Sequence, residues 1–370
     1  MASTFKFLSP NDKISTKTLL HEAIPLTGTI VSGTYSDLNI KNYSHGMFQS
    51  VYDYPYLSSS ANHIFDITFG YSNDSDPRGN TSAAAAQKAK KTNIYNQMAQ
   101  VLVGYDKTGS IQQFDKDGNL ADGAKLKENI FLSFSRLLVK DEIKRGSFQM
   151  TLGVNGAYAT PFTKTIIISD HKAETEYKIN SPVGEYGILY ASNSSGQSNI
   201  ITSNYGTGNH AAHAACGLIY YQAGVVVLSG SAFTVGNILS NSVGSELLFE
   251  PTSTFEQTLT GSSITSTANF LRKRIQNVQF NNTVELNSSI YFCRINHNEY
   301  NYSANPTYLS SSQIRVKSQA SDVPVSYITT VGLYSSDNQL LAVGKLSEPL
   351  RKDPTIEYTL RARLDYWYVP

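Results

Sequence analysis

Apolar and polar residues alternate along three runs near the end of the chain: Ile314–Lys317, Tyr327–Tyr334 and Tyr358–Tyr366. Alternation with a period of two places successive side chains on opposite faces of a β-strand. The polar segment Ser335–Gln339 separates the second run from Leu340–Val343, and its Asp and Asn residues tolerate turn conformations. These patterns predict a β-hairpin with a short polar loop, inside a compact β module that covers residues 278–370.

Further strands are predicted upstream, and turn residues separate many of them at intervals of about ten residues. They are Gly28–Tyr35, Ile64–Tyr71, Phe131–Val139, Phe148–Val154, Thr165–Ser169, Glu176–Ile179, Tyr186–Tyr190 and Gly217–Leu228. A single helical turn is predicted at Lys140–Arg145, and long surface loops are predicted at 192–215 and 237–266. This rhythm is typical of antiparallel β-sandwiches and barrels. The predicted fold class is therefore mainly β, with antiparallel β-sandwich-like domains.

Two helices interrupt this pattern. The longer one is predicted at about 81–104, where an apolar stripe of helical spacing runs through Ile94, Met98, Val101 and Leu102. Gly104 would end it in a left-handed cap. Lys88, Lys90 and Lys91 are interpreted as a solvated face of this helix.

A short helix is predicted at about 266–278. Arg272, Lys273 and Arg274 would lie at its end, where cations complement the helix dipole. Together these elements divide the chain into an N-terminal arm or strand segment (1–60), a β-rich central domain with an inserted helix (61–265) and the C-terminal β-sandwich-like module (278–370).

Composition narrows the classes of function. The formal net charge is +1 and only 16% of residues are charged, whereas a nucleic-acid-binding protein normally shows a clustered basic excess. The chain contains 24 tyrosines, which supply rigid amphipathic contact area at protein interfaces. No apolar run is long enough to span a membrane, and no signal-peptide core follows Met1. We therefore expect no nucleic-acid partner, no membrane and a protein made in a cytoplasm.

Two patterns invite a metal-binding interpretation. Asp115, Asp117 and Asn119 have the spacing of a calcium loop, but Leu120 and Leu126 stand where the EF-hand needs glycine and glutamate. A β-turn is predicted there instead. His210, His213 and Cys216 have the spacing of zinc ligands but stand in a loop-like segment that shows no fourth ligand. A mobile or partner-contacting loop is the favoured interpretation, so no metal and no cofactor are predicted.

None of the sequence motifs of the common catalytic sites stands in the chain. Paired carboxylates for sugar cleavage stay open, because acidic residues that are distant in sequence can meet in space. The sequence therefore favours a protein that is not an enzyme.

Several stretches are similar to known proteins. Tyr43–Tyr56, Asn298–Tyr308, Ser326–Tyr334 and Leu340–Pro349 resemble structural proteins of tailed bacteriophages, especially marine contractile-tailed ones. The resemblance spans most of the chain. It implies a place in the virion, with assembly in the host cytoplasm, and it implies no catalytic mechanism.

The expected function is that of a non-enzymatic structural subunit of a phage virion, in the tail or baseplate. Its partners would be copies of itself and other virion proteins. Interface candidates are Tyr300, Tyr302, Tyr308, Tyr366, Trp367 and Tyr368. Two alternatives stay open: a receptor-binding or fibre-attachment module that contacts a host-surface glycan, and a capsid or neck component.

Overall fold

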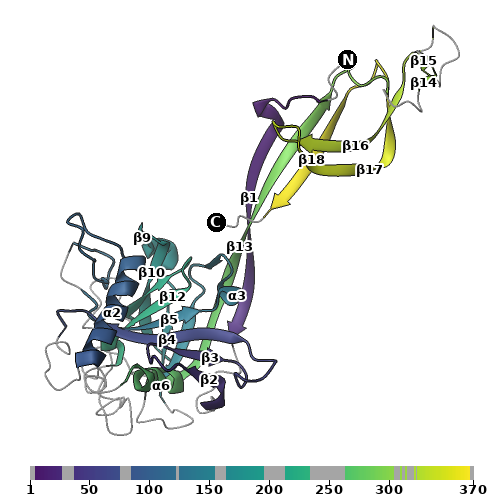
Figure 1. Cartoon of the computed structure of the whole chain (residues 1–370). Helices are drawn as coiled ribbons and strands as arrows, with labels where there is room; N and C mark the ends of the chain where they lie inside the picture. The colour runs from purple at the N-terminus through teal and green to yellow at the C-terminus, as the bar shows by residue number, and fades with distance from the viewer. Residues whose placement is uncertain are drawn as a thin grey trace. The chain divides into compact units, whose positions relative to one another are not determined.

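The computed structural model describes residues 5–26, 37–75, 85–121, 125–154, 164–195, 213–233, 263–303, 309–310, 313–314, 321 and 323–366. These residues form a mainly β structure with a large antiparallel sheet (Figure 1), as the alternating patterns predict. Contacts group the chain into two compact units. Unit 1 comprises Met1–Leu20 and Glu285–Pro370, and unit 2 comprises His21–Val284. The division into 1–60, 61–265 and 278–370 stays a prediction.

Unit 2 is built on antiparallel strands that hydrogen-bond in the order β13-β7-β8-β10-β11-β12-β5-β4-β3-β2. Their bounds are β2 Ile40–Asn42, β3 Gln49–Tyr52, β4 His63–Tyr71, β5 Glu128–Phe134, β7 Gln149–Gly153, β8 Thr165–Ser169, β10 Gly184–Asn193, β11 His213–Tyr220, β12 Val225–Ser229 and β13 Ile275–Ile295. β6 Glu142–Ile143 pairs with β13, and β9 Lys178–Ser181 pairs with β10. Most of these strands follow the apolar runs of the sequence, because each can bury at least one face against the core.

The helices of unit 2 include two that contact β4: α2 Ala85–Leu102 and α6 Ile264–Arg274. Shorter helical segments are η2 Asp37–Asn39, α3 Arg136–Val139, α4 Ala173–Glu176 and η3 Gly230–Phe233. The core between helices and sheet is rich in aromatic side chains, among them Phe69, Tyr95, Phe114 and Phe131. Phe114 has its ring centroid 5.5 Å from that of Tyr95 and 5.6 Å from that of Phe131, so helix and sheet share one aromatic cluster.

Unit 1 contains η1 Pro10–Asp12, the start of β1 Lys13–Leu26 and the second half of β13. It also contains β14 Leu309–Ser310, β15 Gln313–Ile314, β16 Ser326–Tyr334, β17 Leu340–Lys352 and β18 Tyr358–Tyr366. β13 pairs with β18 in the register Ser289↔Leu364 to Ile295↔Tyr358. β16 and β17 form the predicted hairpin, and Ser335 closes its turn by accepting from the N–H groups of Asp337 and Gln339.

Several local predictions are wrong or need correction. The short helix ends at Arg274, and Ile275–Val278 pair with β7 instead of continuing the helix to residue 278. Glu142–Ile143, predicted as part of a helical turn, form the short strand β6, which pairs with β13. Arg136–Val139 form α3 and Glu176 closes α4, so neither segment lies in the predicted strand. A turn at residues 221–224 divides the predicted strand Gly217–Leu228 into β11 and β12. At Glu142–Ile143 and Ile275–Val278, pairing with a strand that is remote in sequence overrides the local pattern.

The predicted stripe of α2 is confirmed at three of its four positions: Ile94 and Leu102 are buried and Met98 packs against the core, whereas Val101 is exposed. Lys91, Tyr95 and Ala99 are buried as well, which widens the packed face. Lys91 is thus no part of a solvated face, and its ammonium lies 5.8 Å from the centroid of the Phe69 ring. The predicted cap is confirmed: Gly104 has a φ of +92° and donates to Ala99 O at 2.9 Å. The predicted start of the helix at 81–84 and the predicted strand Gly28–Tyr35 lie outside the described residues.

Gly70 allows α2 to lie directly on β4. A Cβ at this position would come within 2.6 Å of Lys91 O and 2.7 Å of Tyr95 N. We expect Gly70→Ala to destabilise the protein by about 1–3 kcal/mol, because helix backbone would have to move away from the sheet. Urea denaturation followed by circular dichroism measures this loss. Gly344→Ala is the control, because a Cβ there meets nothing within 4 Å; equal midpoints for the two variants would contradict the packing argument.

Lys91 predicts a pH dependence of stability. Burial lowers the pKa of its ammonium from 10.5 to about 8. Between these pH values the unfolded chain holds a proton that the folded chain has lost, so the free energy of unfolding should rise with pH. Lys91→Met should remove this rise and stabilise the protein at pH 7 by up to about 3 kcal/mol. Unfolding at pH 7 to 10.5 tests this, with Lys90→Met as the control; a parallel pH slope in both variants would exclude Lys91 as its source.

Candidate functional site

Unit 1 carries an apolar face on β13 and β18 that its own residues cover only in part. Alternate residues of β18, Tyr358, Leu360, Ala362 and Leu364, are all half-buried, and they pair with Ile295, Cys293, Tyr291 and Ser289 of β13. The intervening β18 side chains, Thr359, Arg361, Arg363 and Asp365, are exposed. The predicted separation into two faces is therefore confirmed. The residues of unit 1 that the structure describes do not bury this apolar face completely.

The β16–β17 hairpin also leaves apolar side chains exposed. In the part of unit 1 that the structure describes, β16 and β17 form a sheet of two strands and pair only with each other. Leu341 is 67% exposed and Val343 is 63% exposed, and Tyr327, Tyr334 and Leu340 are exposed as well. Among the described residues of unit 1, Ile295 is the single buried apolar side chain. A hairpin of two strands is marginally stable without a further layer.

The N-terminal residues belong to the same surface, which the sequence analysis missed. Phe5 packs edge-on against Tyr334, with ring centroids 4.6 Å apart. Phe7 and Leu8 are exposed. Arg294 donates to Asp12 Oδ1 at 2.7 Å, and this bond is the main reason why the pKa of the Asp12 carboxyl lies below its usual value. No sequence signal links these segments, because they are separated by most of the chain.

The predicted interface tyrosines Tyr300 and Tyr302 lie on a loop that the base of the hairpin holds in place. The buried ammonium of Lys352 donates to His297 O at 3.1 Å, to Asn301 Oδ1 at 2.6 Å and to Asp353 O at 2.8 Å. The Ser326 hydroxyl donates to Tyr300 O. Tyr300 has a φ of +52°, and its ring and that of Tyr302 are 41% and 59% exposed. The loop is therefore pre-organised to present both rings.

The other predicted interface residues are only partly described. Tyr366 lies at the end of β18, exposed, with its hydroxyl 3.4 Å from Ser289 Oγ. Tyr308, Trp367 and Tyr368 lie outside the described residues. The structure thus places Tyr300, Tyr302 and Tyr366 on the surface of unit 1, which is what a contact role requires.

A separate polar pocket of about 370 Å³ opens on unit 2. The Tyr190 hydroxyl donates to Glu176 Oε2 at 2.6 Å, and burial is the main cause that raises the pKa of Tyr190. The phenol therefore stays protonated and holds the Glu176 carboxylate in place. The pocket is lined by Asp117, Asn119, Thr175, Glu176, Tyr177, Lys178, Ile188 and Tyr190.

The residues with metal-ligand spacing in the sequence make other contacts in the structure. Asp115 accepts from the N–H groups of Asp117 and Asn119, which forms the predicted turn. Cys216 is buried, its thiol faces Leu189 O at 3.5 Å, and burial raises its pKa to about 12. His210 lies outside the described residues, and His213 begins β11 instead of lying in the predicted loop 192–215. Over the described ranges, no group of three or more His, Cys, Asp or Glu side chains is placed to hold a metal ion. None of the helices described is long and apolar enough to cross a membrane.

The Lys352 contacts predict how the tyrosine loop responds to mutation. Lys352→Met should leave His297 O, Asn301 Oδ1 and Asp353 O without this donor, at a cost of about 1–3 kcal/mol. Amide hydrogen exchange over residues 296–303 should then be faster by about tenfold or more. Lys345→Met, on an exposed position of β17, is the matched control. Unchanged exchange in Lys352→Met would show that the lysine does not hold the loop.

No family model, curated protein or solved structure matches the chain.

Proposed function

We propose that this chain is a non-enzymatic structural subunit of a bacteriophage virion, in the tail or baseplate, that assembles through the strands and tyrosines of unit 1. The observation that carries the proposal is the distribution of burial. Among the described residues of unit 1, only Ile295 is a buried apolar side chain, although several long strands present apolar faces. A β structure needs a second layer over such faces. A partner chain would supply that layer.

The exposed apolar side chains are numerous enough to drive association. Full burial of a large apolar side chain contributes about 1.5–3 kcal/mol, so completing the burial of Leu341, Val343 and Tyr327 alone is a substantial gain. In the described sheet the outer edges of β16 and β17 have no strand partner. Unpaired strand edges are templates for pairing with another chain. Apolar faces and open edges therefore favour the same kind of contact.

Charge supports a second copy of the chain as one partner. The segment Glu285–Pro370 contains equal numbers of basic and acidic residues, so two copies of it do not repel each other through net charge. The pre-organised loop with Tyr300 and Tyr302 adds aromatic groups of the kind that are enriched in interfaces. The ring-bearing loop and the hairpin are joined through Lys352 and Ser326, so one docking event can cover both.

The virion as the setting of this assembly rests on the resemblance of Tyr43–Tyr56, Asn298–Tyr308, Ser326–Tyr334 and Leu340–Pro349 to structural proteins of tailed phages. The low charge content and the many tyrosines support the same proposal. In such a particle the neighbours of this subunit would be further copies and other virion proteins.

Self-association is tested with a double variant, Leu341→Asp with Val343→Asp. We expect the wild-type chain to form a discrete oligomer in sedimentation velocity, and the variant to sediment as a monomer with an unchanged circular dichroism spectrum. Charged groups on both positions make burial against a partner costly. Leu137→Asp is the control, because Leu137 is 86% exposed on unit 2. A monomeric wild type at high concentration would contradict self-assembly through unit 1.

Placement in the particle is tested separately. Antibody labelling of purified virions should mark the tail or baseplate. Labelling of the capsid or neck would overturn that placement, and absence of the chain from purified particles would overturn the virion proposal as a whole.

A further inference from the structure

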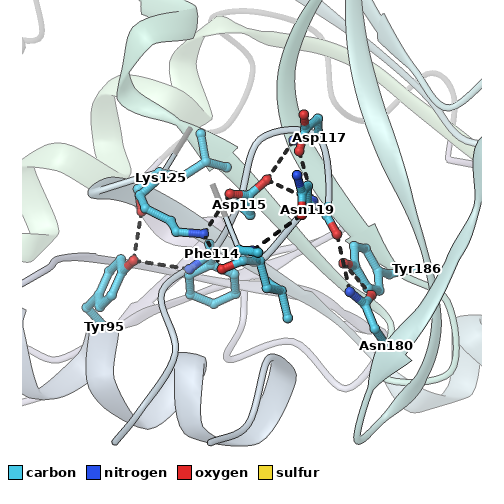
Figure 2. A network of polar contacts seen from close by, with 12 residues as sticks. Tyr95, Phe114, Asp115, Asp117, Asn119, Lys125, Asn180 and Tyr186 are labelled. Atoms are coloured by element: carbon cyan, nitrogen blue, oxygen red, sulfur yellow. Dashed lines mark hydrogen bonds and ion pairs between the residues drawn. The ribbon is translucent and has the colours of Figure 1, made fainter. Parts of the chain in front are cut away.

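Unit 2 contains a buried carboxyl–amine pair that the proposed assembly role does not explain. Lys125 Nζ lies 2.8 Å from Asp115 Oδ2, and the side chains are 19% and 0% exposed. The two residues face each other across an isolated antiparallel bridge. Figure 2 shows the ammonium pointing straight at the carboxyl group. Because burial removes water from both groups, an ion pair here gives up much of its solvation energy.

The surrounding backbone holds this pair in a fixed geometry. The Tyr95 hydroxyl donates to Leu126 O at 2.7 Å and accepts from Phe114 N–H at 3.3 Å. Leu126 N–H donates to Phe114 O at 2.9 Å. The neighbours of Asp115 and Lys125 in sequence are thus bonded to each other and to α2. The amine and the carboxyl group are therefore held at contact distance, and a reaction between two groups held in this way is accelerated most.

Asp115 Oδ1 is held by two backbone donors. The N–H groups of Asp117 and Asn119 each lie 3.1 Å from this oxygen (Figure 2). Two amide donors on one carboxyl oxygen polarise the carbon and would stabilise negative charge that develops on the oxygen during attack. The other oxygen, Oδ2, faces the amine and is free to leave.

A second carboxyl group lies next to the pair. Burial raises the pKa of Asp115, and a hydrogen bond to the carboxylate of Asp117 raises it further. The same bond is the main cause that lowers the pKa of Asp117. Both shifts favour a proton on Asp115 over one on Asp117. Transfer of the shared proton from Lys125 to Asp115 along their hydrogen bond then leaves a neutral acid and a neutral amine beside an ionised Asp117. Amide formation needs this combination: a neutral acid, a neutral amine and a group that moves a proton between them.

We propose that Lys125 and Asp115 condense to an intramolecular isopeptide bond, with Asp117 as the proton carrier. The proton of the ion pair first passes from Nζ to Oδ2. The freed Nζ lone pair then attacks Asp115 Cγ, and the N–C bond forms. The Asp117 carboxylate takes a proton from the nitrogen and passes it to Oδ2. The C–Oδ2 bond then breaks and one water leaves. The reaction needs no oxidant or other reactant, and Asp117 ends as it began.

The product fits the same contacts. The remaining amide N–H can donate to Leu120 O, which accepts from Lys125 Nζ at 2.9 Å before the reaction. Oδ1 keeps its two N–H donors as the amide oxygen. Two buried charges are exchanged for one neutral amide whose donor and acceptor are both bonded. The new bond closes the segment from Asp115 to Lys125 and restricts the unfolded chain as a disulfide would.

The test is the intact mass of the purified full-length chain after incubation of the folded protein at neutral pH. We expect the mass of the sequence less one water. A tryptic digest should contain Thr108–Lys116 joined to Asp117–Lys127, because trypsin does not cleave after an acylated lysine. An unmodified mass in the wild type would overturn the proposal.

Lys125→Arg is the matched control, because arginine keeps the ion pair and is a poor nucleophile. It should show the full mass with an unchanged circular dichroism spectrum. Water can also be lost by cyclisation of Asp117 onto the nitrogen of Gly118 or of Asp122 onto the nitrogen of Gly123. Water loss that persists in Lys125→Arg would assign the modification to such a cyclisation and overturn our proposal. Asp117→Ala should slow formation of the branched peptide by at least tenfold. An unchanged rate would exclude Asp117 as the proton carrier.

Discussion

Burial of apolar side chains is the constraint on which both units of this molecule depend. The described residues bury them in unit 2 but leave many of them exposed in unit 1. Among the described residues, nearly all buried apolar side chains belong to His21–Val284, where aromatic and branched side chains fill the space between a sheet and two helices. In unit 1 the strands are as regular, yet their apolar faces stay half open. A sheet that leaves its apolar side in water is stable only when another surface covers it. The proposed assembly role follows from this shortfall.

Three lysines, two of them buried and one half-buried, show how charged groups are accommodated away from water. Lys352 is hydrogen-bonded by three neutral oxygens, which satisfies all its donors and fixes the tyrosine loop. Lys91 lies beside an aromatic ring, and burial lowers its pKa to about 8. Lys125 meets a buried carboxyl. Lysine thus holds a loop at one position, makes stability depend on pH at a second and forms the proposed reactive pair at a third. The neighbouring atoms determine which of these roles each lysine has.

The pair of Asp115 and Lys125 has a consequence for the proposed role. A subunit that is exposed in a particle gains from covalent links that do not depend on a redox environment, and this chain has two free cysteines far apart in sequence. An amide between side chains provides such a link without any partner protein. The cross-link and the unit 1 surface are independent features, one internal to unit 2 and one directed to other chains.

The local pattern of apolar and polar residues was sufficient to predict the β class and the strands β4, β7, β8, β10, β16 and β18, because a period of two acts within a few residues. It also predicted the hairpin turn at Ser335–Gln339 and the helix end at Gly104, which depend on local backbone preferences. It failed at Glu142–Ile143 and at Ile275–Val278, where pairing with a remote strand decided the conformation. Three of the six predicted interface tyrosine and tryptophan positions are described, and all three are exposed.

The sequence by itself therefore determined where strands and turns can form, and that the chain is rich in groups suited to contacts. Only the tertiary structure decided that Lys91 is buried, that Phe5 joins Tyr334, and that Asp115, Asp117 and Lys125 meet. The physical reason is that a sequence pattern fixes which way a side chain points relative to its own strand or helix. What that side chain then touches depends on segments far along the chain, and its burial, its pKa and its chemistry depend on those contacts.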